Sequence, residues 1–150
     1  PNFRVDLAIN HFALEGIMEG KITPLSNSRR PILHVSDAAR AIVSAVQSNP
    51  EQSHGVYNVV SENVEIYTAA AKVGTFMGKE VITDDAKKDA DARSYHAATL
   101  RDPHFIPRDC IMLGEEAAMN NLVKCAEDNI HTLPRIEALK KLLARGTENL

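Results

Sequence analysis

The chain has little that would support nucleic-acid binding or a membrane span. Tryptophan is absent and aromatic residues make up only 5% of the 150 residues, so stacking platforms for single-stranded nucleic acid are not expected. Lysine and arginine number 17 against 20 aspartates and glutamates. The formal net charge of −3 leaves no basic excess for nucleic acid or an anionic membrane surface. No apolar run approaches the about 20 residues of a membrane-spanning helix. We therefore expect neither nucleic acid nor membrane as a partner.

Reactive and metal-binding signatures are also scarce. Two cysteines, Cys110 and Cys125, are too few for a disulfide scaffold and lack metal-site spacing, so both are expected to be reduced thiols in a cytoplasmic protein. None of the six histidines lies four residues from another, which excludes a helical metal pair. The chain contains no Gly-x-Ser-x-Gly, no Gly-x-Gly-x-x-Gly and no P-loop. No metal site and no nucleophilic catalyst is predicted.

The patterns that are present alternate short strands with helices, which predicts an α/β or α+β architecture. Helical spacing of apolar residues predicts about five helices, at 5–18, 36–49, 67–77, 111–129 and 136–145. Short strands are predicted at 21–25, 32–35, 56–60 and 80–83. We expect residues 1–130 to form the main unit and residues 131–150 a C-terminal helical tail.

The run 56–60, Val-Tyr-Asn-Val-Val, is typical of a strand buried on both faces. Such a strand needs neighbours on both sides, and the chain offers few long strands. We therefore expect an incomplete sheet, part of which comes from another chain or a missing segment.

Residues 29–40 hold the most suggestive polar pattern. Arg29 and Arg30 precede a short apolar strand, and Ser36 or Asp37 then provides a helix N-cap. This arrangement suits an anion site at the edge of a pocket, and a surface arginine pair beside a capped helix is the alternative.

A second polar cluster, Arg93-Ser94-Tyr95-His96, lies in a stretch expected to be extended. Two arginine sites far apart in sequence could clamp a diphosphate from both sides, because guanidinium forks match phosphate oxygens. A solvent-facing strand edge is the alternative for this cluster.

The runs 4–10 and 30–42 resemble the extended short-chain dehydrogenase/reductase family, and more narrowly its NAD-dependent nucleotide-sugar epimerases and dehydratases. The resemblance continues through 55–59, returns at 91–95 and 105–107, and fades after about residue 129. It implies an α/β fold, namely the C-terminal substrate-binding portion of an extended Rossmann-type enzyme.

In that family the N-terminal half carries a glycine-rich NAD loop and a catalytic Tyr-x-x-x-Lys. Here the residues four positions after the three tyrosines are Ser61, Ala71 and Thr99, and none is lysine. The resemblance therefore implies that the N-terminal NAD-binding domain is absent, that NAD(P) belongs to the parent enzyme, and that this chain alone holds no cofactor and is not catalytically competent.

The resemblance assigns three substrate-binding residues. Arg30 matches the arginine that meets the nucleotide diphosphate, Arg93 is similar to a second phosphate-facing arginine, and Asn10 lies on a helix that borders the substrate. The implied partners are a nucleotide-diphosphate sugar and either a separate NAD-binding chain or a second copy of this chain. Two alternatives remain: a non-enzymatic binding or regulatory module derived from that half, and an interaction domain with no small ligand.

Overall fold

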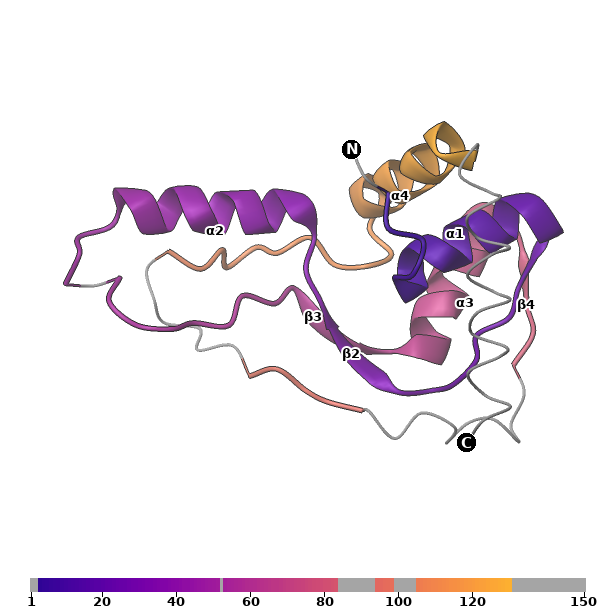
Figure 1. The fold of residues 1–150 in the computed structure, drawn as a ribbon, viewed down its shortest axis with the longest axis horizontal. Coiled ribbons are helices and arrows are strands. Elements are labelled where there is room, and N and C mark those ends of the chain that lie inside the picture. The colour runs from indigo at the N-terminus through magenta and orange to yellow at the C-terminus, as the bar shows by residue number, and fades with distance from the viewer. Residues whose placement is uncertain (1–2, 52, 84–93, 99–104, 131–150) are drawn as a thin grey trace.

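The computed structural model describes residues 3–51, 53–83, 94–98 and 105–130. Over these residues the protein is a mixed α/β structure with four helices and two small two-stranded sheets, which confirms the expected class in its coarse form (Figure 1). The elements in chain order are α1 (Ala8–Glu19), β1 (Lys21–Ile22), β2 (Arg29–Ile32), α2 (Val35–Gln47), β3 (Glu62–Glu65), α3 (Ile66–Met77), β4 (Glu80–Val81) and α4 (Glu116–Asp128). The fifth predicted helix, 136–145, and the tail 131–150 lie outside the described residues.

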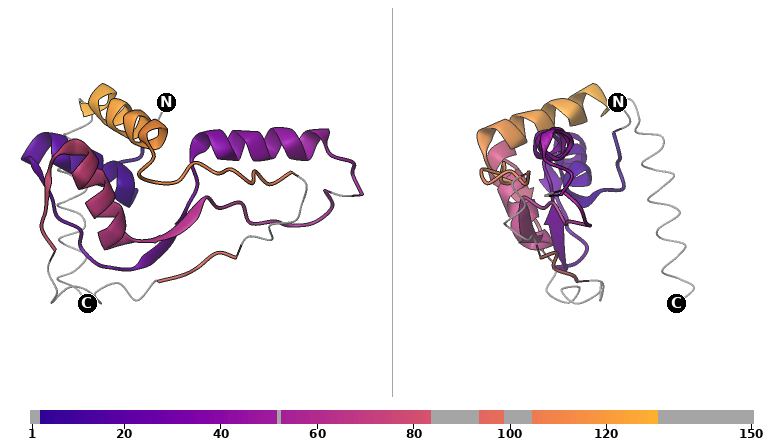
Figure 2. Two further views of the ribbon diagram at one scale, coloured as in Figure 1. Left: turned by 180° about the vertical axis from the view of Figure 1, so that it is seen from behind. Right: turned by 90° about the vertical axis from the view of Figure 1, so that its left-hand side faces the viewer.

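A body of three helices contains the core. Helices α1, α3 and α4 gather at one end of the molecule in both Figure 1 and Figure 2. Strands β1 and β4 pair in parallel beside them, with Lys21 opposite Glu80 and Ile22 opposite Val81. Helical spacing places one apolar face of each helix inward. The main buried cluster consists of Phe12, Ile22, Val64, Ile66, Ala69, Ala70, Val73, Leu113 and Met119.

An antiparallel ladder leads from this body to α2. Strands β2 and β3 pair Arg29 with Glu65, Arg30 with Val64, Pro31 with Asn63 and Ile32 with Glu62. Helix α2 leaves the far end of β2 and lies well apart from the other helices (Figures 1 and 2). We call α2, with the segments 53–60 and 105–112 that run beside it, the arm.

The strand that the sequence predicts at 32–35 lies three residues earlier in the structure. It forms at Arg29–Ile32, because Val35 already belongs to α2. The N-cap is His34 rather than Ser36 or Asp37, and its Nδ1 accepts from the backbone N–H of Ser36 at 3.2 Å. A side-chain acceptor at the cap satisfies an N–H of the first turn, so the helix can begin there.

The predicted strand at 56–60 is wrong. Within the described residues this segment joins no ladder, and Val56 is 98% exposed rather than buried on both faces. The strand forms instead at Glu62–Glu65, where β2 offers a partner. β-branched residues favour a strand only where neighbouring backbone can pair with it, and no described strand lies along 56–60.

The helices follow the sequence pattern with shifted starts. Helices α1 and α3 end at Gly20 and Gly78, whose φ angles of 72° and 63° are left-handed, as C-terminal caps often are. The helix predicted from residue 111 begins at Glu116, because Gly114 adopts a φ of 104° that no helix continues. No described helix is both long and apolar enough to cross a membrane.

We predict that Gly74→Ala destabilises the body. A Cβ at Gly74 would overlap Val81 Cγ2 and lie 3.0 Å from the Lys79 carbonyl oxygen, so α3 and β4 would have to separate. Overpacking of this kind costs about 1–3 kcal/mol of unfolding free energy in urea titrations. Gly16→Ala is the control, because its Cβ would meet the flexible Met77 side chain at 3.1 Å. Equal stability of the two variants would contradict the packing described here.

Candidate anion site

Arg30 sits at the centre of the candidate site. It lies on β2 opposite Val64 and is partly buried. Its Nη1 donates to the backbone carbonyl of Arg29 at 2.9 Å, and its guanidinium carbon lies 5.3 Å from the ring centroid of Tyr95. This distance is within the range of a cation–π interaction. The guanidinium is therefore fixed by a backbone oxygen and an aromatic face.

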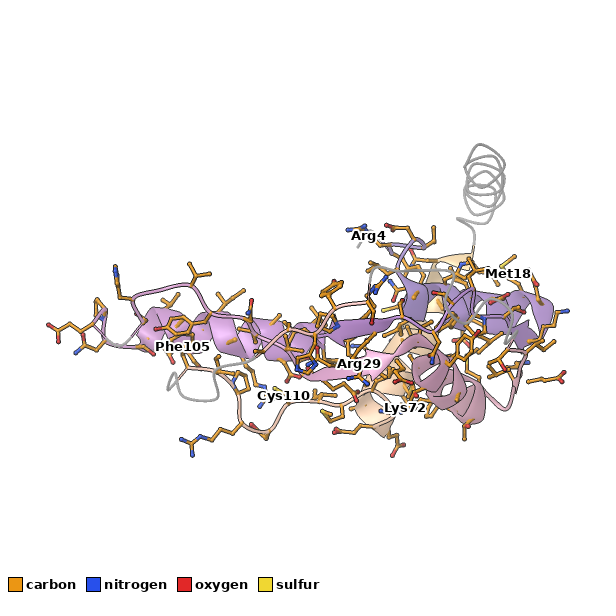
Figure 3. The ribbon with its side chains drawn as sticks, turned by 90° about the horizontal axis from the view of Figure 1, so that it is seen from below. Arg4, Met18, Arg29, Lys72, Phe105 and Cys110 are labelled. Atoms are coloured by element: carbon orange, nitrogen blue, oxygen red, sulfur yellow. The ribbon has the colours of Figure 1, made fainter. Side chains whose placement is uncertain are left out.

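Arg29 is engaged elsewhere. Successive residues of a strand point to opposite faces, so the two arginines diverge. Arg29 Nη2 donates to Glu65 Oε1 at 3.1 Å across the ladder, and both side chains are about half exposed. Such an exposed pair contributes little to stability, but it occupies this guanidinium. Figure 3 shows Arg29 midway along the molecule, and the ladder register places it opposite Glu65, at the end of the ladder next to α3.

Residues 94–98, which we call the strap, lie against the ladder. Both backbone groups of Arg29 form hydrogen bonds with the first part of the strap. Its N–H donates to Ser94 Oγ at 3.0 Å, and its carbonyl accepts from the N–H of Tyr95 at 3.2 Å. The sequence predicts an extended segment of no assigned type here, and the structure assigns no strand to residues 94–98.

Two asparagines hold the second part of the strap. The side-chain amide of Asn63 makes two hydrogen bonds to the backbone of Ala97. Its Nδ2 donates to the Ala97 carbonyl at 3.1 Å, and its Oδ1 accepts from the Ala97 N–H at 3.0 Å. Asn58 Nδ2 donates to the Ala98 carbonyl at 3.2 Å. Side-chain amides thus replace the backbone ladder that a regular third strand would form.

A cavity of about 370 Å³ opens beside the strap. Residues 31–33, 57–60, Tyr95 and Ala97 line it, so Tyr95 stands between the cavity and Arg30. Tyr57 also lines the cavity and is fixed in place: its hydroxyl donates to the His54 carbonyl at 2.9 Å, and its ring meets Phe105 edge-on with centroids 5.0 Å apart. The cavity therefore combines two aromatic walls with a nearby cation.

A buried carboxylate fixes the arm behind this site. Asp37 has no exposed side-chain area and accepts from Arg40 Nη2 at 2.5 Å, Ser61 Oγ at 3.0 Å and the backbone N–H of Ile111 at 2.7 Å. Arg40 also donates to both carboxylate oxygens of Asp109 at 3.1 Å and to its backbone carbonyl at 2.8 Å. The network joins α2, the start of β3 and the segment before α4.

The charge network sets the pKa of Asp37. Burial alone disfavours the carboxylate, but hydrogen bonds from Arg40, Ile111 and Ser61 outweigh it, so the pKa is lowered from its usual range. Close by, burial and the Asp37 charge raise the pKa of the Cys110 thiol, whose Sγ donates to the Pro107 carbonyl at 3.3 Å. A raised pKa makes Cys110 a poor nucleophile. Figure 3 places Cys110 and Phe105 beside α2.

Of the three predicted site residues, Arg30 lies next to this cavity, behind the Tyr95 ring, and is not one of its lining residues. Arg93 lies outside the described residues, directly before the strap. Asn10 is on α1, where its Nδ2 donates to the Arg4 carbonyl at 2.9 Å, and it does not line the cavity. Sequence reasoning noted Tyr95 only within a polar cluster and did not identify Tyr57. No group of three metal-ligating side chains occurs in the part of the chain that the structure describes.

No protein-family model matches the chain, and no curated protein is found to be similar to it.

We predict that Asp37→Asn lowers the free energy of unfolding at pH 7 by about 1–3 kcal/mol, because it weakens hydrogen bonds to a buried carboxylate. The folded-state pKa is lowered, so this contribution is present above the unfolded-state value of about 3.9 and is lost as the pH falls further. Urea titrations at pH 7 and pH 3.5 should show the gap between wild type and variant shrinking in acid.

The control for this pH dependence is Asp6→Asn. Asp6 pairs with Arg4 on an exposed surface, so its loss should leave stability unchanged within error. A gap between wild type and Asp37→Asn that is constant with pH would contradict the assigned role of the carboxylate charge.

Proposed function

We propose that this chain is the substrate-binding portion of an NAD-dependent nucleotide-sugar epimerase or dehydratase. The observation that carries the proposal is the guanidinium of Arg30, held at a fixed position beside an aromatic-walled cavity. The resemblance of residues 30–42 to such enzymes supports the same assignment. The cytoplasmic location expected from the two free cysteines is part of the proposal.

Arg30 would bind the diphosphate of the substrate. A guanidinium presents a planar fork of N–H donors that matches phosphate oxygens, and holding it in place before binding reduces the ordering that the ligand must impose. The role of this chain's own residues is then to bind and orient the diphosphate.

The residues of this chain do not fit a dinucleotide cofactor. The sequence has no glycine-rich loop and no Tyr-x-x-x-Lys. In the proposed parent enzyme, hydride chemistry would belong to the cofactor on a separate NAD-binding domain.

The outer face of α2 supports a partner domain of this kind. Val35, Ile42 and Val46 are 68%, 65% and 81% exposed, and residues 41–47 contain no charged side chain. Val56, on the neighbouring extended segment, is exposed as well. Apolar surface gathered on one element, rather than scattered, is typical of an interface. We propose that an NAD-binding domain covers this face.

We predict that nucleotide-diphosphate sugars bind at Arg30. In calorimetric titrations with UDP-, GDP- and dTDP-sugars, at least one should bind the wild type, and Arg30→Gln should weaken that affinity about 10- to 100-fold through loss of a charge-assisted contact.

The matched control is Arg29→Gln, which removes the same charge one residue away. Arg29 is occupied by Glu65, so this variant should bind like the wild type. The proposal fails if none of the three classes binds, or if Arg30→Gln binds as the wild type does.

We predict that the outer face of α2 can be made polar without unfolding the chain. The double variant Ile42→Glu/Val46→Glu should keep its unfolding free energy within about 0.5 kcal/mol, since surface changes away from packed contacts are nearly neutral. Light scattering should show the same mass for the wild type and the double variant. Ala41→Glu, on the buried side of the same helix, should lower stability by about 1–3 kcal/mol.

Two outcomes would contradict the proposal that an NAD-binding domain covers the outer face of α2. One is a loss of stability in the double variant equal to that of Ala41→Glu. The other is a discrete wild-type dimer that the double variant abolishes, because a second copy would then cover α2 and favour the regulatory-module alternative.

A further inference from the structure

We propose that Tyr95 is a positioning residue for Arg30, and that the strap makes anion affinity depend on where this ring is held. The inference rests on the proposed role of Arg30 in diphosphate binding and adds a residue that neither the sequence pattern nor the resemblance assigns.

The carbonyl oxygen of Arg29 binds both the backbone of Tyr95 and the guanidinium of Arg30, and so fixes the ring and the cation relative to each other. The Arg29 carbonyl accepts from the N–H of Tyr95 at 3.2 Å and from Arg30 Nη1 at 2.9 Å. The N–H of the same residue donates to Ser94 Oγ at 3.0 Å. Both backbone groups of Arg29 are therefore used to place the strap, and the ring of Tyr95 comes to lie 5.3 Å from the guanidinium carbon.

The other end of the strap prevents the ring from drifting. Asn63 binds the N–H and the carbonyl of Ala97, and Asn58 binds the carbonyl of Ala98. Tyr95 is thus anchored at its own position and again two and three residues later. A ring carried by a segment held at both ends can restrict the rotation of an arginine side chain, which otherwise loses considerable freedom on binding.

Tyr95 does not act by filling the core. Its side chain is 56% exposed, and it belongs to neither buried cluster of the body. Truncation of the ring should therefore leave stability almost unchanged while the guanidinium gains freedom. This separation between binding and stability distinguishes a positioning residue from a structural one.

The test uses inorganic pyrophosphate, which presents the diphosphate without a base or a sugar. With the full chain, Tyr95→Leu should weaken pyrophosphate affinity about two- to fivefold, the size of an exposed cation–π contact. Tyr95→Phe keeps the ring and should bind within about twofold of the wild type. Urea unfolding should be unchanged for both. Equal affinity of wild type and Tyr95→Leu, or an equal loss in Tyr95→Phe, would overturn the inference.

A second measurement needs no ligand. Nuclear magnetic resonance of the Arg30 side chain, assigned with Arg30→Gln, reports rotation about the Cζ–Nε bond. We expect slow rotation in the wild type and in Tyr95→Phe, and faster rotation in Tyr95→Leu. Unchanged rotation in Tyr95→Leu would refute the positioning role even if pyrophosphate binds.

The two proposals fail separately. If Arg30→Gln binds pyrophosphate as well as the wild type, Arg30 is not the diphosphate residue, and the rotation measurement alone decides the role of Tyr95. If Arg30→Gln loses binding while Tyr95→Leu does not, the proposed function stands and the positioning role is wrong.

Discussion

The carboxylate of Asp37 is the interaction on which the arm depends. It is fully buried, yet it binds an arginine on its own helix, a serine before β3 and a backbone N–H at residue 111. A buried charge is tolerated only when hydrogen bonds replace its lost hydration, so all three segments must stay in place together. Because α2 directly follows β2, this network also fixes the direction in which the ladder leaves the body.

The body and the arm are stabilised in different ways. Three helices bury a continuous apolar cluster in the body, whereas polar contacts organise the arm and leave apolar side chains of α2 exposed. Arg30 lies at the boundary, on a strand of the ladder that joins the two parts. Under the proposed function, an NAD-binding domain would bury the exposed apolar face of α2.

Local patterns predicted the helices of the body well, because apolar spacing and glycine stops are properties of a single segment. Pairing was harder to predict. The run 56–60 has strand-forming residues but no described partner, while Glu62–Glu65 has polar residues and pairs with β2. The candidate site shows the same division: Arg30 stands in a local sequence motif, whereas the placement of Tyr95 depends on a backbone contact 66 residues away, from its own N–H to the Arg29 carbonyl. Likewise, the hydrogen bond from the Ile111 N–H to the Asp37 carboxylate joins residues 74 positions apart, so no local sequence pattern predicts it.

Hydrogen exchange with and without nucleotide-diphosphate sugars, read by mass spectrometry on the full chain, tests the central claim most directly. The account predicts slower exchange in peptides that cover 29–33 and 94–98, where the ladder and the strap surround Arg30, and no change in α4. Protection confined to α4, or no protection with any UDP-, GDP- or dTDP-sugar at saturating concentration, would contradict it.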